Sequence, residues 1–531
     1  MKMVNIYAGH DTNITFCDTE KNKYHLIEVE RLLKERYFRM QVDDWIFSRY
    51  VGDQEKVDIL KQCVEIAQKF WGFENDFDIV STSIDGRLHE NILRQVFNSK
   101  QFTVCGDHHL MHASSTFYQS NFNEALIISY DGGGNDGFFN VYRGDSEGIH
   151  HLEKIESDFG GGYLVLSSSV EEVTKGSSHV LSLPGKLMGL SAYGTPDITK
   201  VSHFVKLYND RNYQEFSDSM GGIFKNAHHP WRTLLQNHIF SSQQGYNFAA
   251  TIQLSYEVAF INIFQRLLKQ YSPQNVCITG GGALNVLLNQ KIKNMYNVNL
   301  FIPPNPNDCG LSLGAAFILE KPKNRIDITY KGLPILDLDN LDNYLQGRNH
   351  EIVTFEKLSK LLKEGKIIGI IRGDSEVGPR ALGNRSIICD PSHENMKDIL
   401  NSKVKFREWY RPFAPFCKLE DANKYFESKN FDNFEFMSYA PKVKEEYKKT
   451  LPSITHVDGT ARLQCVTEKS HKFFYDLLTK FSEVSNTSVL LNTSFNIRGN
   501  PILTTIEDAL YVLDNTELDA VVIENTLITK N

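Results

Sequence analysis

Three apolar runs rich in β-branched and aromatic residues each lead into a polar, glycine-containing turn. They are VNIYAGHDTNITF at 4–16, ALIISYDGGGNDGFFNVY at 125–142 and VCITGGGALNVLLN at 276–289. The first two return to apolar residues after the turn, which predicts β-hairpins, whereas the third continues into a stretch with helical periodicity. We therefore expect two strand–turn–strand units followed by a strand–turn–helix unit.

This order of turns is similar to that of the actin-like ATPases, whose two related α/β halves close over a nucleotide. Glycines allow backbone N–H groups to approach phosphate oxygens, and a helix that starts after GGG presents free amides at its N-terminus. One glycine-rich turn alone is more often an ordinary tight turn, but three in this order favour phosphate loops. The candidate nucleotide-binding residues are Gly132, Gly133, Gly280, Gly281, Gly282 and Asn285.

A polar stretch with Pro and Gly, at about 320–350, predicts a linker. Beyond it, predicted strands at 366–373, 488–495 and 518–530 alternate with predicted helices at 354–365, 471–484 and 505–515. Such alternation is typical of a second α/β domain. We therefore predict an α/β protein with domains at 1–340 and 341–531.

The composition favours a soluble globular protein, with 41% apolar and 23% charged residues. No apolar run approaches the roughly 18–20 residues of a membrane span, and the first residues lack a signal-peptide pattern, so we expect a cytoplasmic protein without a membrane partner. The eight cysteines form no C-x-x-C pair, which argues against a zinc ribbon. A net charge of -8 excludes general attraction to nucleic acids.

A candidate metal site starts from His108 and His112 in DHHLMHASS. On a helix, residues four apart face the same way and could bind one ion. Asp131 ends an apolar run and Asp308 lies in a Pro/Asn loop; two imidazoles and two carboxylates suit iron, manganese or another divalent ion. A lone pair of this spacing is more often structural, but its polar neighbours favour ligands. His109 points elsewhere, toward support or acceptor contact.

The C-terminal part has a dense group of cations among Gly, Pro and Phe, in GDSEVGPRALGNRS (373–386) and NSKVKFREWYRPFAP (401–415). Guanidinium groups bind phosphates and carboxylates bidentately, and a lysine adds a point charge. A later strand, LLNTSFNIRGNPI (490–502), ends in polar residues that suit phosphate or carbonyl oxygens. A solvated face and turn capping are the alternatives. The candidates are Glu376, Arg380, Arg385, Lys405, Arg407, Arg411, Asn492, Ser494 and Asn496.

Seven motifs, among them HHLMHASSTFYQS, GKLMGLSAYG, GPRALGNRSI, KFREWYRPFAP and HVDGTARLQ, resemble the NodU/CmcH-type carbamoyltransferase family, the TobZ-like O-carbamoyltransferases. The resemblance runs from about residue 4 to 528. It implies an N-terminal actin-like domain related to the threonylcarbamoyl-transferring ATPases and a C-terminal YrdC-like domain. It also implies that carbamoyl phosphate and ATP, with Mg, yield carbamoyl-adenylate and pyrophosphate, after which the carbamoyl group moves to a hydroxyl.

Residue by residue, the family's metal ligands match His108, His112, Asp131 and Asp308. The YrdC-like signature matches Lys405-Phe406-Arg407 and Ser494-Phe495-Asn496. In the first turn, His10 and Asp11 are candidates for the base that deprotonates the acceptor, with a structural hairpin role as the alternative. Relatives usually carry acidic residues where Asn500 and the pair Asn135 and Asp136 stand, which concerns fine specificity.

Several possibilities stay open at this point. The acceptor is a small hydroxylated metabolite, or the hydroxymethyl group of a modified pyrimidine, free or in DNA, and a homo-oligomer is possible. We expect acceptor recognition in 195–248, whose basic and aromatic residues include Lys206, Arg211, Lys225, His228, His229, Trp231 and Arg232. Stacking and phosphate contact would use such residues. The alternatives are a fused tRNA threonylcarbamoylation-type enzyme and a non-catalytic, nucleotide-gated binding protein.

Overall fold

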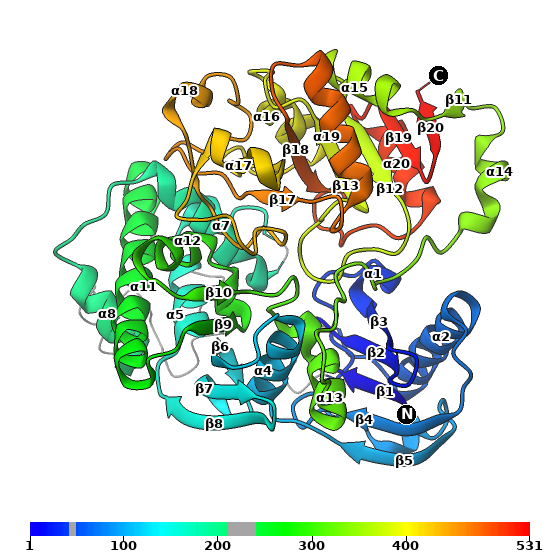
Figure 1. Ribbon diagram of the computed structural model, residues 1–531, viewed down its shortest axis with the longest axis vertical. Coiled ribbons are helices and arrows are strands. Elements are labelled where there is room, and N and C mark those ends of the chain that lie inside the picture. The colour runs from blue at the N-terminus through cyan, green and yellow to red at the C-terminus, as the bar shows by residue number, and fades with distance from the viewer. Residues whose placement is uncertain (42–48, 178, 211–239, 531) are drawn as a thin grey trace. The chain divides into compact units, whose positions relative to one another are not determined.

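The computed structural model describes residues 1–41, 49–177, 179–210 and 240–530 (Figure 1). The chain forms two compact units. The first comprises Met1–Lys23, Tyr37–Leu288 and Met295–Ile326; the second comprises Tyr24–Arg36, Asn289–Asn294 and Asp327–Asn531. Two short segments from the N-terminal part of the chain therefore belong to the second unit.

The two predicted hairpins each form part of a five-stranded sheet. The first sheet has the order β3-β2-β1-β4-β5, from β1 (Lys2–Tyr7), β2 (Asn13–Asp18), β3 (Lys23–Glu28), β4 (Phe77–Thr82) and β5 (Ser99–Val104). The second has the order β10-β9-β6-β7-β8, from β6 (Ala125–Gly134), β7 (Gly137–Asp145), β8 (Gly148–Ile155), β9 (Asn275–Thr279) and β10 (Asn299–Phe301). In both, the first strand pairs antiparallel with its hairpin partner and parallel with a later strand. The two sheets thus share one topology.

Two helices of the first unit pack on each other, one from each sheet's neighbourhood (Figure 1). Helix α4 (His108–Gln119) contacts β6, β7 and β9, whereas α13 (Leu311–Glu320) contacts β1, β2 and β4. A Cβ on Gly314 would lie 2.0 Å from the carbonyl oxygen of Met111, so only glycine permits this approach. Tyr7, Met111, Leu311 and Ala315 form the apolar cluster beneath. This packing brings the first turns of both helices together.

The third glycine run departs from the prediction in one detail. After β9 the chain forms a 3-10 turn, η3 (Gly281–Leu284), and α12 (Val286–Met295) begins only afterwards. Asn285 ends the turn, and its side-chain oxygen accepts a hydrogen bond from the amide of Leu288. The helix therefore begins later than GGG because the glycine turn and this side-chain cap come first.

The other helices of the first unit include α2 (Asp53–Trp71), α5 (Phe159–Ser167), α7 (Leu183–Leu190), α8 (Val201–Asp210) and α11 (Ser242–Tyr271). Among them, α2 lies in the connection between β3 and β4, whereas α5, α7, α8 and α11 lie in the connection between β8 and β9. Of the predicted acceptor segment, Lys206 lies on α8. Arg211, Lys225, His228, His229, Trp231 and Arg232 lie outside the described residues.

The second unit is built on an eight-stranded sheet with the order β11-β20-β19-β12-β13-β18-β14-β17. Its strands are β11 (His350–Ile352), β12 (Ile368–Ile371), β13 (Arg385–Cys389), β14 (Ala414–Lys418), β17 (Gln464–Val466), β18 (Val489–Ser494), β19 (Ala520–Ile523) and β20 (Thr526–Thr529). The predicted strand at 518–530 is thus a hairpin, β19–β20. Helices α15 (Phe355–Lys363), α19 (Lys472–Val484) and α20 (Ile506–Asn515) match the predicted helices. The predicted linker contains a short helix, α14 (Leu341–Leu345).

The apolar core of the second unit explains why α15 and α19 form amphipathic helices. Leu358 and Leu362 from α15 and Phe474 and Leu478 from α19 are completely buried against the sheet. All eight cysteines are buried thiols that lie outside any disulfide. Among the helices that the structure describes, none combines the length and apolar composition needed to cross a bilayer.

Candidate active sites

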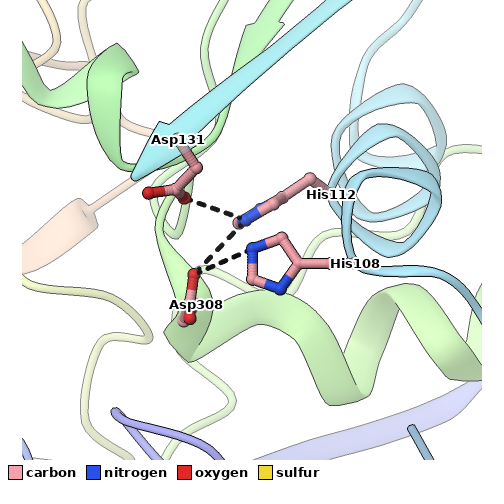
Figure 2. Close-up of side chains that lie close together, drawn as sticks. All are labelled: His108, His112, Asp131 and Asp308. Atoms are coloured by element: carbon pink, nitrogen blue, oxygen red, sulfur yellow. Dashed lines mark ion pairs between the residues drawn. The ribbon is translucent and has the colours of Figure 1, made fainter. Parts of the chain in front are cut away.

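Two imidazoles project from the first turns of α4 toward two carboxylates (Figure 2). The helix begins at His108, so His108 and His112 stand on the same side of it, one turn apart. Asp131 comes from β6, and Asp308 lies in η4 (Asp308–Gly310), immediately before α13. The packing of α4 on α13 and on β6 therefore brings together four side chains from three separate segments of the chain.

The geometry of these four side chains suits a divalent cation. His112 Nε2 lies 3.2 Å from Asp131 Oδ2 and 3.4 Å from Asp308 Oδ1, and His108 Nε2 lies 3.6 Å from Asp308 Oδ1 (Figure 2). One ligand atom from each residue lies within 4.8 Å of all the others. The two Nε2 atoms and Asp308 Oδ1 are buried without a hydrogen-bond partner. Buried polar atoms require partners, so their convergence fits a metal ion.

Charges in this cluster shift the proton affinities strongly. Burial lowers the pKa of His112, but Asp131 and Asp308 outweigh burial and raise this pKa to about 9. Burial raises the pKa of Asp308, yet the neighbouring histidines, with His10 first, hold it well below its usual range. When no cation is bound, protonated imidazoles offset the negative charge of the two carboxylates. A metal ion would displace these protons.

The glycine turns predicted to bind nucleotide also orient a metal ligand. The amide of Gly132 donates to Asp131 Oδ1 at 2.6 Å, and the amide of Gly281 donates to Asp131 Oδ2 at 2.7 Å. Gly280 has a φ of 87°, and its amide donates to the carbonyl of Pro306. The remaining predicted residues of this group are Gly133, with a φ of 143°, Gly282 and the helix-capping Asn285. The turns of β6 and β9 therefore meet at Asp131.

His10 lies beside the cluster of His108, His112, Asp131 and Asp308. Its Nε2 is 3.1 Å from Asp308 Oδ2, and its Nδ1 is 3.2 Å from Asp11 Oδ2. The hydroxyl of Tyr7 donates to the same oxygen of Asp308 at 2.8 Å. Burial lowers the pKa of His10, but Asp308 and Asp11 outweigh burial and raise it to about 9. About a third of the His10 side chain is exposed, so an acceptor can reach it.

A carboxylate that the sequence analysis missed supports His108. Asp85 Oδ2 lies 3.0 Å from His108 Nδ1, the ring nitrogen that faces away from the cluster. A carboxylate on the second nitrogen fixes the tautomer and orientation of a metal-binding histidine. Asp85 follows β4 in an Asp-Gly turn, so its position after an apolar strand is the signal that could have identified it.

Residues around the start of α4 hold the helix rather than the metal. His109 is buried, with its ring within 2.7 Å of the hydroxyl of Ser129 and 3.1 Å of the carbonyl of Gly137, so it has a supporting role. Asn135 Oδ1 accepts from the amide of His108, and the carboxylate of Asp136 accepts from the amide of His109. The residues that depart from the family pattern thus cap the helix that carries the ligands.

The second unit brings together the two halves of the predicted YrdC-like signature. Lys405 Nζ donates to the carbonyl oxygens of Ser494 and Asn496, at 2.6 and 2.7 Å, and to both of their side chains. A π-helical turn, η6 (Leu400–Val404), ends at Lys405, and Phe406 has a φ of 49°. Such turns occur often at functional sites, and here the reversal places Lys405 and Arg407 in one buried site.

Cations crowd this site far beyond its negative charge. Burial lowers the pKa of Lys405, and Arg407, Arg411 and Arg36 lower it further. The sequence analysis missed Arg462, which lies in HVDGTARLQ. Burial lowers its pKa, and Arg380, Arg411 and Arg407 do so as well. Among the described residues, Glu408 forms ion pairs with Arg411 and Arg498, at 3.7 and 3.4 Å. The site therefore suits a polyanion.

Three predicted substrate-binding residues instead contact the loop that carries Arg380. Glu376 Oε1 accepts from the amides of Leu382, Gly383 and Arg385. The guanidinium of Arg385 donates to four backbone carbonyls, those of Arg372, Gly373, Asn384 and Leu333. Asn492 Nδ2 donates to the carbonyl of Ala381 at 3.0 Å. In the structure, Glu376, Arg385 and Asn492 thus shape the loop, whereas Arg380 faces the other cations.

Comparison with known proteins was made for the whole chain. The family described as Carbamoyltransferase N-terminus matches residues 9–317, and Carbamoyltransferase C-terminus matches residues 359–530. Nodulation protein NolO of Bradyrhizobium diazoefficiens is 31% identical over 80% of this chain and 79% of its own. The 3'-hydroxymethylcephem-O-carbamoyltransferase of Streptomyces clavuligerus is 31% identical over 64% of both chains.

Among solved structures, full-length HypF in its phosphate- and nucleotide-bound form matches 60% of this chain and 46% of its own, with 11% identity and a TM-score of 0.35. The two family matches cover most of the chain and confirm the resemblance that its motifs predicted. The chain is an enzyme that belongs to the carbamoyltransferase family.

Proposed function

We propose that this carbamoyltransferase is ATP-dependent, transfers the carbamoyl group to a hydroxyl and works in two half-reactions. In the first, carbamoyl phosphate, ATP and water give carbamoyl-adenylate, pyrophosphate and phosphate. Water cleaves carbamoyl phosphate to carbamate and phosphate, and a carbamate oxygen then attacks the α-phosphorus of ATP as pyrophosphate leaves. In the second, the acceptor hydroxyl attacks the carbamoyl carbon and AMP leaves. We assign the first to the site of Lys405 and the second to that of His112.

The observation that carries this proposal is the cation cluster of the second unit. Lys405 is buried, and Arg407 and Arg462 are partly buried. Loss of solvent lowers the pKa of each, and neighbouring arginines lower it further. Mutual repulsion of this kind destabilises a protein unless an anion offsets it. ATP with Mg and carbamoyl phosphate supply several phosphate groups, and the arginine forks can hold them. Ser494 and Asn496, which contact Lys405, would bind nearby oxygens.

For the second half-reaction, the first unit provides a metal site and a proton acceptor. A divalent cation, iron or manganese, held by His108, His112, Asp131 and Asp308 would act as a Lewis acid toward the carbamoyl carbonyl. In its neutral form, His10 would take the proton of the acceptor hydroxyl at Nε2, the atom 3.1 Å from Asp308 Oδ2. Because the neighbouring carboxylates outweigh burial and raise its pKa to about 9, His10 must first release its own proton. Asp11, 3.2 Å from the other ring nitrogen, would orient the imidazole.

We further propose that the first unit has the actin-like fold and the second the YrdC-like fold. The repeated sheet topology of the first unit supports the former, because two related halves are the basis of that fold. The hydrogen bond from Lys405 to Ser494, the last residue of β18, supports the latter. The glycines at 132–133 and 280–282 would then approach phosphate oxygens of a nucleotide in the first unit.

The name of one relative, the cephem carbamoyltransferase, supports a proposal for the class of acceptor. The cephem enzyme acts on a hydroxymethyl group. A hydroxymethyl group, on a small metabolite or on a modified pyrimidine, free or in DNA, is therefore our proposed acceptor class.

Exchange of labelled pyrophosphate into ATP tests the first half-reaction. We expect exchange that depends on carbamoyl phosphate, as the cation cluster requires. Stimulation by bicarbonate plus threonine, but not by carbamoyl phosphate, would instead indicate the threonylcarbamoylation-type enzyme. Absence of exchange under both conditions would leave a nucleotide-gated binding protein as the better description.

A further inference from the structure

Arg31 lies near the N-terminus of the chain but contacts a loop of the cation site. It belongs to α1 (Val29–Leu33), within the Tyr24–Arg36 segment of the second unit. Arg31 is 2% exposed and is one of the largest fully buried side chains. Its Nη1 donates to the carbonyl of Glu376 at 2.6 Å and to the hydroxyl of Ser375 at 3.3 Å. Both acceptors belong to the loop with the sequence GDSEVGPRALGNRS at 373–386.

Both backbone polar groups of Gly378 are held by this segment. Arg31 Nη2 donates to the carbonyl of Gly378 at 2.5 Å, and the amide of Gly378 donates to Glu28 Oε2 at 3.3 Å. Glu28 and Arg31 also pair with each other, 2.8 Å apart. Gly378 has a φ of 107°, a backbone conformation that strongly favours glycine. Glu28 and Arg31 therefore form a clamp that binds the loop at this turn.

Arg380 follows this clamped turn by two positions. The pKa of the partly buried Arg462 is lowered first by loss of solvent and then by the positive charge of Arg380, which therefore lies close to it. On its other side, the loop is fixed by Glu376, which accepts the amides of Leu382 and Gly383. Arg380 is therefore presented by a turn whose two flanks are both tied down, one of them by Arg31.

We infer that Arg31 is a positioning residue of the adenylation site, which holds the Gly378 turn so that Arg380 faces the phosphates. The inference rests on the proposed function. A planar fork that reaches two carbonyls and a carboxylate at once explains why the position is an arginine, because a lysine offers one point charge. A buried ion pair alone is weak evidence for a stabilising role, whereas here the donors converge on one loop.

Arg31→Lys is the first test, because it keeps a positive charge opposite Glu28 and removes the fork. We expect the apparent KM for carbamoyl phosphate in pyrophosphate exchange to rise about tenfold or more, as loss of charge-assisted hydrogen bonds implies, with a smaller change in kcat. Hydrogen exchange of the amides at 378–385 should accelerate as well. The matched control is Lys34→Asn on the same segment, which removes an exposed ion pair with Asp508 and should change neither quantity.

A second variant, Glu28→Gln with Arg31→Met, is used if the single change unfolds the protein. It removes both charges and so leaves no unpaired buried ion. It should also raise KM in a protein that still unfolds cooperatively. Folded variants with wild-type KM and wild-type loop exchange would overturn the inference. Failure of the proposed function is a separate result, since the wild-type protein would then show no exchange that depends on carbamoyl phosphate.

Discussion

His10 Nε2 lies 3.1 Å from Oδ2 of Asp308, while the other oxygen of that carboxylate lies 3.4 Å from His112. One buried carboxylate thus stands between the candidate base and the candidate metal ligands. The turn between β1 and β2 supplies His10, and the turn before α13 supplies Asp308. Under the proposed function, this relationship places the candidate base and the candidate metal ligands together in the first unit.

His112→Ala should stop transfer and spare adenylation. Loss of one of four ligands should weaken metal binding at least about 100-fold, because even outer-sphere partners cost 10–100-fold. Pyrophosphate exchange should keep its wild-type rate, since His112 belongs to the first unit. Metal content and the two half-reactions are measured separately. The control is His150→Ala, an exposed histidine of the same unit. Equal loss of both half-reactions would contradict the two-site assignment.

Asp85→Asn should weaken metal binding through His108 without removing a ligand. The variant loses the negative charge 3.0 Å from His108 Nδ1, so we expect affinity for the ion to fall about 10–100-fold. Titration of the metal-free protein with manganese would measure this change. Asp76→Asn, at an exposed carboxylate, serves as the comparison. Unchanged affinity in Asp85→Asn would show that His108 needs no such partner.

Lys405→Ala should abolish pyrophosphate exchange, because the ammonium that joins Ser494 to Asn496 and faces the phosphates is lost. Metal content should stay at the wild-type level. Lys403→Ala, two residues earlier and exposed, should retain exchange and controls for the local charge. Exchange at the wild-type rate in Lys405→Ala would remove this residue from the adenylation site.

Metal affinity should depend on pH. The carboxylates outweigh burial and raise the pKa of His112 to about 9, so a proton must leave before the ring can bind an ion. Apparent affinity should therefore tighten by about tenfold per pH unit for each proton released, up to about pH 9. In the metal-free protein the charged form stabilises the fold below about pH 6.5, and this is lost as pH rises through about 9.

Calorimetry in two buffers with different ionisation enthalpies would count the released protons. Affinity that stays constant between about pH 6.5 and 9 would show that His112 is neutral before the ion binds.

The sequence predicted the two hairpins and the shared helix face of His108 and His112 because each depends on local pattern. His108 and His112 follow from helical spacing, and β1–β2 and β6–β7 follow from apolar runs with a turn between them. Asp85 and Arg31 escaped prediction because their roles depend on tertiary contacts. Asp85 follows an apolar strand, but that position alone does not indicate that it contacts His108. Arg31 binds a loop more than 300 positions later.

The predicted cations divide for a similar reason. Arg380, Arg385 and Arg411 cannot be told apart from the sequence, because only their burial and their contacts in the fold distinguish them. Arg385 is surrounded by backbone carbonyls. By contrast, loss of solvent lowers the pKa of the partly buried Arg462, and Arg380 and Arg411 lower it further. Composition and spacing predict a phosphate-binding site. Tertiary packing decides which guanidinium groups are held by backbone carbonyls and which could bind phosphate.

The most direct measurement supplies ATP and carbamoyl phosphate with a panel of hydroxylated acceptors, including hydroxymethylated DNA. We predict one added carbamoyl group, detected by mass spectrometry, with AMP, pyrophosphate and phosphate formed in equal amounts. Carbamoylated product without AMP or pyrophosphate would contradict the proposed adenylate route.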